Sequence, residues 1–284
     1  DRVTTGAGND SISAGSGSNS IKSGDGNDTI VTGDGDDRIN VENGNSSVSA
    51  GEGNNTINGK NGNNTVVTGS GDDRVTLGNG SNHLTLGDGR NSVRLKDGDS
   101  TITAGAGHDR IKGGDGSYLI SGGEGNNNVQ VGHGNSTVTS GIGNDRISLK
   151  DGNHNIVVSG GKNTVSIGAG DSTIYDYDAA GHLSKVTNAL GHETTVTAVN
   201  GLGQPTSLTD ENGVVTALTY NERGWLSSVT VNPGAGESRT RLYYDGVGQV
   251  IRTRLPDGEE IRYEYDNARY LTGIENNRGE RIEY

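Results

Sequence analysis

Apolar positions in the first 176 residues follow a nine-residue period. Counting from Gly6, nineteen nonapeptides fit without insertion or deletion up to Asp176, and the seventh position of each is Ile, Val or Leu. The sixth and eighth positions are mostly Ser, Thr, Asn, Arg and Lys. Polar and apolar side chains therefore alternate over three residues, which predicts a short strand with one face turned inward.

Glycine marks the turn that precedes each of these strands. The third position of the nonapeptide is Gly in all nineteen units, from Gly8 to Gly170. Glycine tolerates positive φ, so a tight turn is expected there. One short strand cannot bury its aliphatic residue alone, so the units must coil and stack. With two nonapeptides per coil, we predict a right-handed parallel β-helix, or β-roll, of 18 residues per coil with two parallel sheets.

The composition supports a repeat architecture rather than an ordinary globular core. The chain of 284 residues has 50 Gly, is 28% hydrophobic, and contains one Trp and no Phe, Met or Cys. So few large apolar residues cannot fill a compact core, and excess acid would otherwise predict disorder. Stacked repeats share one narrow core instead. The lack of Met indicates an excised or processed fragment, and the lack of Cys is typical of a secreted bacterial protein stabilised without disulfides.

The nonapeptide resembles the RTX repeat, G-G-x-G-x-D-x-U-x, over about residues 1–176. The resemblance implies a parallel β-roll that binds calcium in the turns, with the motif aspartate and backbone carbonyls as ligands. The first glycine of the motif is usually Ala, Ser, Thr, Leu or Val in this chain. The motif aspartate occurs in only six of the nineteen units, and the implied metal ligands are Asp10, Asp28, Asp37, Asp73, Asp109 and Asp145.

Along one edge of the predicted rod, which we call the Asp/Asn edge, the fifth position alternates strictly between two residue types. From the partial first unit onward it contains Asp1, Asn19, Asp37, Asn55, Asp73, Asn91, Asp109, Asn127, Asp145 and Asn163. Aspartates stacked about 4.8 Å apart would repel by about 3.5 kcal/mol at an effective dielectric of about 20. Alternation with Asn roughly halves that repulsion and allows amide side chains to bridge successive coils.

Two alternatives remain for this edge. Calcium could bind at each aspartate together with the Asn and backbone carbonyls. The Asp/Asn ladder could instead hold without metal, helped by the Arg that follows each aspartate: Arg38, Arg74, Arg110 and Arg146. On the opposite edge, carboxylates occur only at Asp10 and Asp28, one coil apart. This pair is the best single candidate for a calcium site.

From Tyr175 onward the pattern changes. Nine of the ten Tyr lie there, with Trp225 and all three Pro. An aromatic residue or Val ends a strand, Asp or Asn opens a turn, and Gly supplies positive φ before the next strand, which predicts β-hairpins in an antiparallel ribbon. The phrase occurs five times, as YDAAGHL (177–183), VNGLGQP (199–205), YNERGWL (220–226), YDGVGQV (244–250) and YDNARYL (265–271).

These phrases resemble the RHS, or YD, repeat of bacterial polymorphic toxins, toxin-complex proteins and teneurins, over residues 175–284. The resemblance implies a ribbon that spirals into a hollow shell around a toxic C-terminal domain, although five units are too few to close a shell. The fifth unit has Arg269 in the place of Gly, so we expect its turn to differ. The predicted domains are 1–176 and 177–284. We expect them to share one sheet, with the first hairpin near Tyr175–Tyr177 capping the open end of the rod.

Several function classes are disfavoured. The net charge of −13 argues against nucleic-acid binding, which needs a basic stripe that is not evident in the sequence. No run of about 18 apolar residues predicts a membrane span. The six His form neither an HExxH motif nor a nucleophile–His–acid set, so we expect no enzyme and no catalytic residue. The position between the turn glycines carries no Thr array, which argues against ice binding.

Two functions remain. The first is a non-catalytic scaffold fragment of a large secreted bacterial RHS-type toxin or effector, with a C-terminal toxin domain or the rest of an RHS shell as its partner. The second is a calcium-dependent surface adhesin or binding module that contacts a protein, a glycan or the cell surface. Both place the chain outside the bacterial cytoplasm, secreted or at the cell surface. Calcium is the one candidate cofactor: the adhesin requires it, whereas the scaffold also allows a rod without metal.

Overall fold

The computed structural model describes residues 1–234 and 236–284, and all regular secondary structure in these ranges is β. This confirms the predicted all-β class. No helix in the described ranges is long and apolar enough to span a membrane. The chain divides into two compact units, one of residues 1–182 and 186–191 and the other of residues 183–185 and 192–284. They are called the rod and the ribbon below. The predicted boundary at 176/177 and the shared sheet stay predictions.

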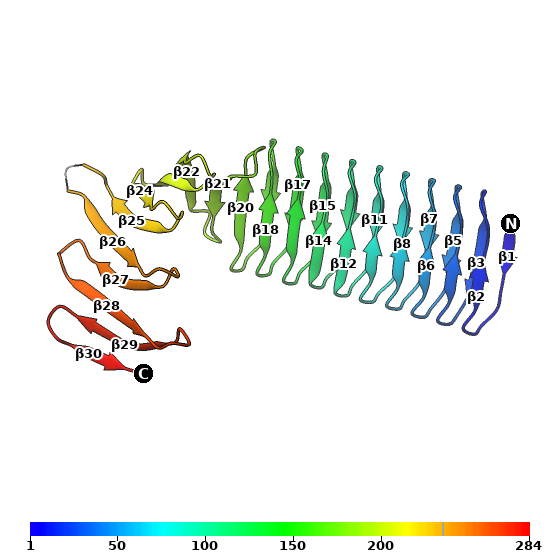
Figure 1. The fold of residues 1–284 in the computed structure, drawn as a ribbon. Coiled ribbons are helices and arrows are strands. Elements are labelled where there is room, and N and C mark those ends of the chain that lie inside the picture. The colour runs from blue at the N-terminus through cyan, green and yellow to red at the C-terminus, as the bar shows by residue number, and fades with distance from the viewer. Residues whose placement is uncertain (235) are drawn as a thin grey trace. The chain divides into compact units, whose positions relative to one another are not determined.

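The rod is a stack of two-strand coils that follow one another along the chain (Figure 1). Alternate strands form two parallel sheets, in which residues pair with a partner 18 positions later, as Ile21 does with Ile39 and Val48 with Val66. The predicted coil of 18 residues is therefore confirmed. Sheet A contains β1 (Arg2–Thr4), β3 (Ser20–Gly24), β5 (Arg38–Val41), β7 (Thr56–Asn58), β9 (Arg74–Thr76), β11 (Ser92–Arg94), β13 (Arg110–Lys112), β15 (Asn128–Val131), β17 (Arg146–Leu149) and β19 (Thr164–Ser166).

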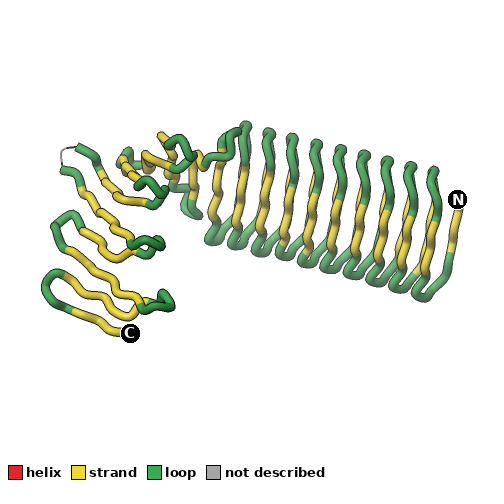
Figure 2. The backbone as a smooth tube through the Cα atoms, viewed as in Figure 1, coloured by secondary structure: helices red, strands yellow, loops and turns green. Residues whose placement is uncertain are grey.

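The second sheet of the rod is formed by the even-numbered strands, and short turns connect it to sheet A twice in every coil (Figure 2). Sheet B contains β2 (Ser11–Ser13), β4 (Thr29–Val31), β6 (Ser47–Ser49), β8 (Thr65–Val67), β10 (His83–Thr85), β12 (Ser100–Thr103), β14 (Tyr118–Ser121), β16 (Thr137–Ser140), β18 (Asn155–Val158) and β20 (Thr173–Tyr177).

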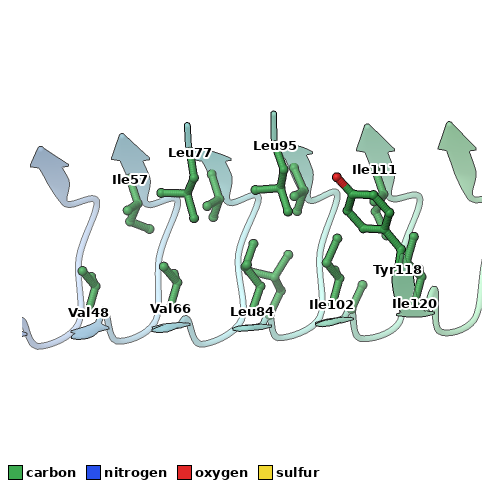
Figure 3. Packing of buried hydrophobic residues seen from close by; sticks show 14 of the residues in the cluster. Val48, Ile57, Val66, Leu77, Leu84, Leu95, Ile102, Ile111, Tyr118 and Ile120 are labelled. Atoms are coloured by element: carbon green, nitrogen blue, oxygen red, sulfur yellow. The ribbon is translucent and has the colours of Figure 1, made fainter. Parts of the chain in front are cut away.

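Two rows of side chains fill the rod, where the period predicted one. The seventh-position residues form the first row, and Ile57, Val66 and Ile102 are fully buried. Figure 3 shows Leu77 and Leu95 packed between them from the ninth position. That position is where the RTX motif has its first glycine, and burying a Leu there contributes about 1.5–3 kcal/mol. The buried apolar residues at the ninth position are Ala14, Val41, Ala50, Leu77, Leu86, Leu95, Ala104, Val131, Leu149 and Val158.

Tyr118 is the one aromatic side chain in this core cluster. Only 2% of it is exposed, and its hydroxyl donates a hydrogen bond to the Lys96 carbonyl at 3.0 Å. The ninth position of the preceding nonapeptide is Gly113, and a Cβ there would lie 2.5 Å from the Tyr118 ring carbon Cζ. The small residue and the large one therefore compensate each other, and the ring occupies volume that aliphatic residues fill in other coils (Figure 3).

The third-position glycines are required by both conformation and space. Gly62 has φ +144°, and a Cβ on it would lie 1.9 Å from the Gly44 carbonyl oxygen of the coil before. Side chains are excluded because successive turns stack backbone on backbone. Positive φ at all nineteen third positions, and a close backbone neighbour from Gly26 onward, explain why this position is always Gly.

The ribbon consists of antiparallel strands joined by short turns (Figure 2). Successive strands pair from β22 to β30, which confirms the predicted hairpins for that stretch. Its strands, with β21 divided between the two units, are β21 (Leu183–Thr187), β22 (Glu193–Val199), β23 (Pro205–Asp210), β24 (Val215–Tyr220), β25 (Leu226–Val231), β26 (Ser238–Tyr244), β27 (Val250–Arg254), β28 (Glu260–Tyr265), β29 (Leu271–Asn276) and β30 (Arg281–Glu283).

Asp or Asn closes the turns of the ribbon with its side chain. Asp245 Oδ1, for example, accepts hydrogen bonds from the backbone N–H groups of Val247 and Gln249 at 2.9 and 3.0 Å. The fifth phrase uses the same geometry, because Asp266 Oδ1 accepts from the Tyr270 N–H at 2.9 Å and Arg269 adopts φ +70°. The expectation of a different turn at Arg269 was therefore wrong. A non-glycine residue takes the left-handed conformation there at some cost in strain.

Tyrosine hydroxyls at three of the repeated phrases donate to a backbone carbonyl near the preceding phrase. Tyr220 donates to the Pro205 carbonyl at 2.8 Å, and Tyr265 donates to the Val250 carbonyl at 2.9 Å. Tyr244 makes the corresponding bond to Leu226 at 2.8 Å. These bonds repeat with the sequence motif, so its aromatic residue is an inter-hairpin tie as well as a strand terminator.

Candidate functional site

The fifth-position residues of the rod form a buried hydrogen-bonded ladder. On the Asp/Asn edge, the Asn19 N–H donates to Asp37 Oδ1 at 2.7 Å, and the Asp37 N–H donates to Asn55 Oδ1 at 3.1 Å. The same bond continues from coil to coil as far as Asn163. Asp and Asn are interchangeable in this role because both supply an Oδ1 acceptor.

The second polar atom of each side chain separates the two residue types. In the turn at residues 15–19, Asn19 Nδ2 donates to the carbonyls of Gly15 and Gly17 at 2.8 and 2.7 Å. In the turn two nonapeptides later, Asp37 has the same shape but presents Oδ2, which is buried without a hydrogen-bond partner. Asp37 Oδ2 thus takes the place that a donor, Nδ2, occupies in Asn19. A bound cation or a proton would stabilise this buried oxygen.

This feature is shared by every aspartate that the sequence singled out. Of the described residues, those with a buried aspartate Oδ2 that lacks a hydrogen-bond partner are Asp10, Asp28, Asp37, Asp73, Asp109 and Asp145. Four lie on the Asp/Asn edge, two coils apart, with an Asn rung between. The structure does not bring these four together into one site, so each belongs to its own turn.

Asp10 and Asp28 lie on the other edge, in successive coils. The Asp10 N–H donates to Asp28 Oδ1 at 3.0 Å, and only 1% of Asp28 is exposed. Above them the edge becomes neutral, and Ser46 Oγ donates to the Gly26 carbonyl at 3.3 Å. Asn64 likewise places its Nδ2 on the Gly62 carbonyl at 3.0 Å. Among the fifth-position residues, Asp10 and Asp28 are the two carboxylates that lie in directly successive coils.

Hydroxyl groups accompany the aspartates in a pattern that the sequence analysis missed. Ser23, Thr32 and Thr68 occupy the ninth position just before the turns of Asp28, Asp37 and Asp73, and their hydroxyls are buried without a partner. The ninth position before Asn turns is instead occupied by residues without a hydroxyl: Ala14, Ala50, Gly59, Leu77, Leu86, Gly122 and Val158. The paired occurrence of hydroxyl and aspartate could have been found by comparing these two positions.

Burial makes the charged form of these carboxyl groups costly. Desolvation raises the pKa of Asp109 to about 6, against the opposing effect of the hydrogen bond from the Asn91 N–H. Desolvation also raises the pKa of Asp73, against the opposing effect of the hydrogen bond from the Asn55 N–H. A bound cation would remove this penalty, since it stabilises the ionised carboxylate.

The donor set of each aspartate turn fits calcium. It combines a carboxylate oxygen, turn carbonyls and, in several coils, a hydroxyl, and calcium prefers such oxygen ligands. No group of three or more His, Asp or Glu side chains converges among the described residues. Each turn therefore supplies few charges, and the sites would be weak and dependent on water ligands.

A depression of about 940 Å³ lies on the described part of the ribbon. Trp225 and Tyr244 line it with ring centroids 5.3 Å apart, and the Arg223 guanidinium lies 5.2 Å from the centroid of Trp225. The residue that follows the turn glycine contacts the next turn: Gln204 Nε2 donates to the Gly224 carbonyl at 2.9 Å, and Trp225 packs on Gly248. The depression thus arises from the hairpin repeat itself.

The fold and these turns define a parallel β-roll with calcium-type turns, joined in one chain to a ribbon of β-hairpins. The model of the RTX calcium-binding nonapeptide repeat matches seven overlapping stretches that together cover residues 1–153, more than half of the chain. The chain belongs to the RTX calcium-binding nonapeptide repeat family. The RHS repeat model matches residues 199–237 and 244–281, so the ribbon is built of RHS repeats. No curated protein matches the chain.

Solved structures with local similarity come from toxin complexes. The crystal structure of TcdB2-TccC3-TEV is 26% identical over 37% of this chain and 5% of that chain, with a TM-score of 0.29. The Photorhabdus luminescens Tc holotoxin pore with a TccC3 variant is 22% identical over 36% and 7%, with a TM-score of 0.27. This chain spans less than a tenth of those chains. At such scores the likeness carries no conclusion on function.

Proposed function

We propose that this chain is a non-catalytic structural segment of a large secreted bacterial RHS-type toxin. The rod acts as a spacer, and the ribbon forms part of a shell around a C-terminal toxin domain. The observation that carries the proposal is the RHS repeat match over two stretches of the ribbon. The ribbon supports it because its described apolar side chains are half-buried or exposed, so its faces remain available to further repeats or cargo.

The rod's part in this proposal depends on calcium. Its ligands would be Asp10, Asp28, Asp37, Asp73, Asp109 and Asp145, together with turn carbonyls. When bound, calcium would supply the positive charge that each buried carboxylate lacks. Extracellular fluids are richer in calcium than the cytoplasm, so the rod would complete its folding after secretion. Between the calcium coils, the Asn rungs and the ninth-position core hold the rod together without metal.

Limited proteolysis of the full-length protein that carries this chain tests the proposal. With calcium, we expect the rod to resist the protease and the downstream domain to survive intact within the RHS shell. With a chelator, cleavage should begin in the rod while the shell still protects that domain. A downstream domain that is cut as fast in the full-length protein as in isolation would contradict the shell. A rod that resists equally in calcium and chelator would contradict the calcium role.

A further inference from the structure

The outer face of sheet A concentrates the positive charge of an acidic rod. Residues 1–176 carry 13 basic and 21 acidic side chains. The outward positions of sheet A hold eight exposed cations and no acid, because the acidic residues lie in the turns and at the inward-facing rungs. The eight are Arg2, Lys22, Arg38, Arg74, Arg94, Arg110, Lys112 and Arg146. The expectation that the chain has no basic stripe was therefore wrong. It rested on the net negative charge, which does not show how the charges are distributed over the faces of the rod.

The stripe has a regular order along the rod. Its first row has Arg in every second strand, and Ser, Thr or Asn in the strands between: Arg2, Ser20, Arg38, Thr56, Arg74, Ser92, Arg110, Asn128, Arg146 and Thr164. Since neighbouring strands lie about 4.8 Å apart, these guanidinium groups repeat about every 9.6 Å. Guanidinium groups and hydroxyl or amide groups therefore alternate along this row.

The stripe is densest over β9, β11 and β13. Ser92 pairs with both Arg74 and Arg110, and Arg94 pairs with Lys112 in the same sheet. These side chains line a depression of about 260 Å³. None of the four cations forms an ion pair with a carboxylate of the described residues, so their charge is available to a ligand.

We propose that the outer face of sheet A binds a linear acidic glycan laid along the rod. Its sulfate or carboxylate groups would lie on the arginines, and its neutral hydroxyls on the Ser and Thr between them. Single-stranded nucleic acid also needs aromatic stacking, and a membrane surface needs exposed apolar side chains. The outward positions of sheet A carry neither. Clustered basic residues are a known basis of heparin binding.

The proposal goes beyond the structural role and does not depend on the RHS shell. Sheet B shows that the charge is a property of one face, since its outward positions have no Arg or Lys and are mostly Ser, Thr and Val. The glycan would therefore contact one side of the rod only. Because guanidinium groups pair with anionic oxygens in a bidentate fork, Arg suits this role better than Lys.

Fluorescence anisotropy of labelled heparin with the whole chain, at one fixed calcium concentration, tests the proposal. We expect binding that weakens steeply with salt. The double variant Arg74→Ser and Arg110→Ser uses a residue already present at that position in β11, so it should fold, and it should weaken heparin binding at least tenfold. The slope of log affinity against log salt should fall by roughly one per Arg removed.

A matched variant removes the same two charges elsewhere on the rod. Lys150→Asn with Lys162→Asn changes exposed turn residues and should alter heparin affinity less than twofold. An equal loss in both double variants would overturn the proposal, as would no binding of heparin by the native chain. Tighter binding of an oligothymidylate or of phosphatidylserine vesicles than of heparin would overturn the choice of a glycan. Unchanged melting temperatures of the variants confirm that folding is intact.

Discussion

The rod and the ribbon are both all-β, yet they are stabilised by different means. Among the described residues, all buried hydrophobic side chains lie in the rod, between Ile12 and Val158. In the described part of the ribbon, the side chains that reach the same degree of burial are Ser228 and Thr230. Each coil of the rod places two strands around a shared interior, so their inward side chains form a core. Each hairpin of the ribbon only extends a sheet whose faces stay open. Burial in a β-repeat therefore depends on closure, not on strand content.

The largest effect is expected when residues 1–191 and residues 192–284 are expressed as separate proteins. We expect the first to unfold in one cooperative transition near that of the intact chain, because its core is internal. The second should show little cooperativity, because a multistranded sheet needs a buried hydrophobic face to be stable alone and the described ribbon residues provide little of one. Circular dichroism melts of both segments measure this. A ribbon that melts as sharply as the rod would overturn the contrast.

Truncation of one Ile in each region tests the same difference at a single side chain. Ile57→Ala in the rod removes a fully buried residue and should lower the free energy of unfolding by about 2–5 kcal/mol. Ile274→Ala in β29 of the ribbon removes a half-buried residue and should cost less than about 1.5 kcal/mol. Urea unfolding curves of both variants provide the values, and equal costs would contradict the proposed distribution of the core.

Exchange of Asp for Asn separates the metal-dependent coils from the others. Asp37→Asn with Asp73→Asn should raise the melting temperature in chelator, because each new amide can donate to turn carbonyls as Asn19 does. Each buried unpartnered oxygen that is relieved is worth about 1–3 kcal/mol. The calcium-induced rise should shrink in the same variant. The reverse exchange, Asn55→Asp, is the matched control and should lower the melting temperature in chelator.

The pH dependence of the metal-free rod follows from the raised pKa of Asp109. Its folded pKa of about 6 lies above the ordinary value of 3.8, so the folded chain binds a proton that the unfolded chain has released. The free energy of unfolding should therefore fall as pH rises from 3.8 to about 6. Calcium should reduce this fall by stabilising the ionised form. Thermal unfolding in chelator, at several pH values, measures this fall for the native chain and for Asp109→Asn. The same dependence of stability on pH in both proteins would contradict the prediction.

The smallest expected effect lies in the ribbon. Tyr265→Phe removes the hydroxyl that donates to the Val250 carbonyl at 2.9 Å, and it should cost about 1 kcal/mol. Tyr270→Phe, at a side chain that is 72% exposed, should cost almost nothing. Denaturation of the intact chain followed by tyrosine-region circular dichroism measures both. Equal effects would show that the inter-hairpin bond contributes nothing measurable.

Much of the candidate site could be predicted from the sequence, because its residues recur at one position of the repeat. The six aspartates were found by counting, and each has a buried unpartnered Oδ2 in the structure. The ninth-position hydroxyls such as Thr68 were missed, because a repeat predicts positions and not which side chains face one another. The Arg269 turn was mispredicted for a related reason: the turn's hydrogen bonds to Asp266 hold the backbone in a conformation that residue preference alone disfavours.

The sequence by itself determined the coil. A strict nine-residue period with one invariant glycine buries its aliphatic residues when the nonapeptides coil and stack. It also determined the hairpins of the ribbon through its Asp-to-Gly turns. Only the tertiary structure decided which polar atoms meet. Stacking in an 18-residue register places Asp Oδ2 where the Asn amide finds carbonyls, and it aligns cations from every second nonapeptide on one face. Charges far apart in an acidic sequence thereby become neighbours about two strand spacings apart.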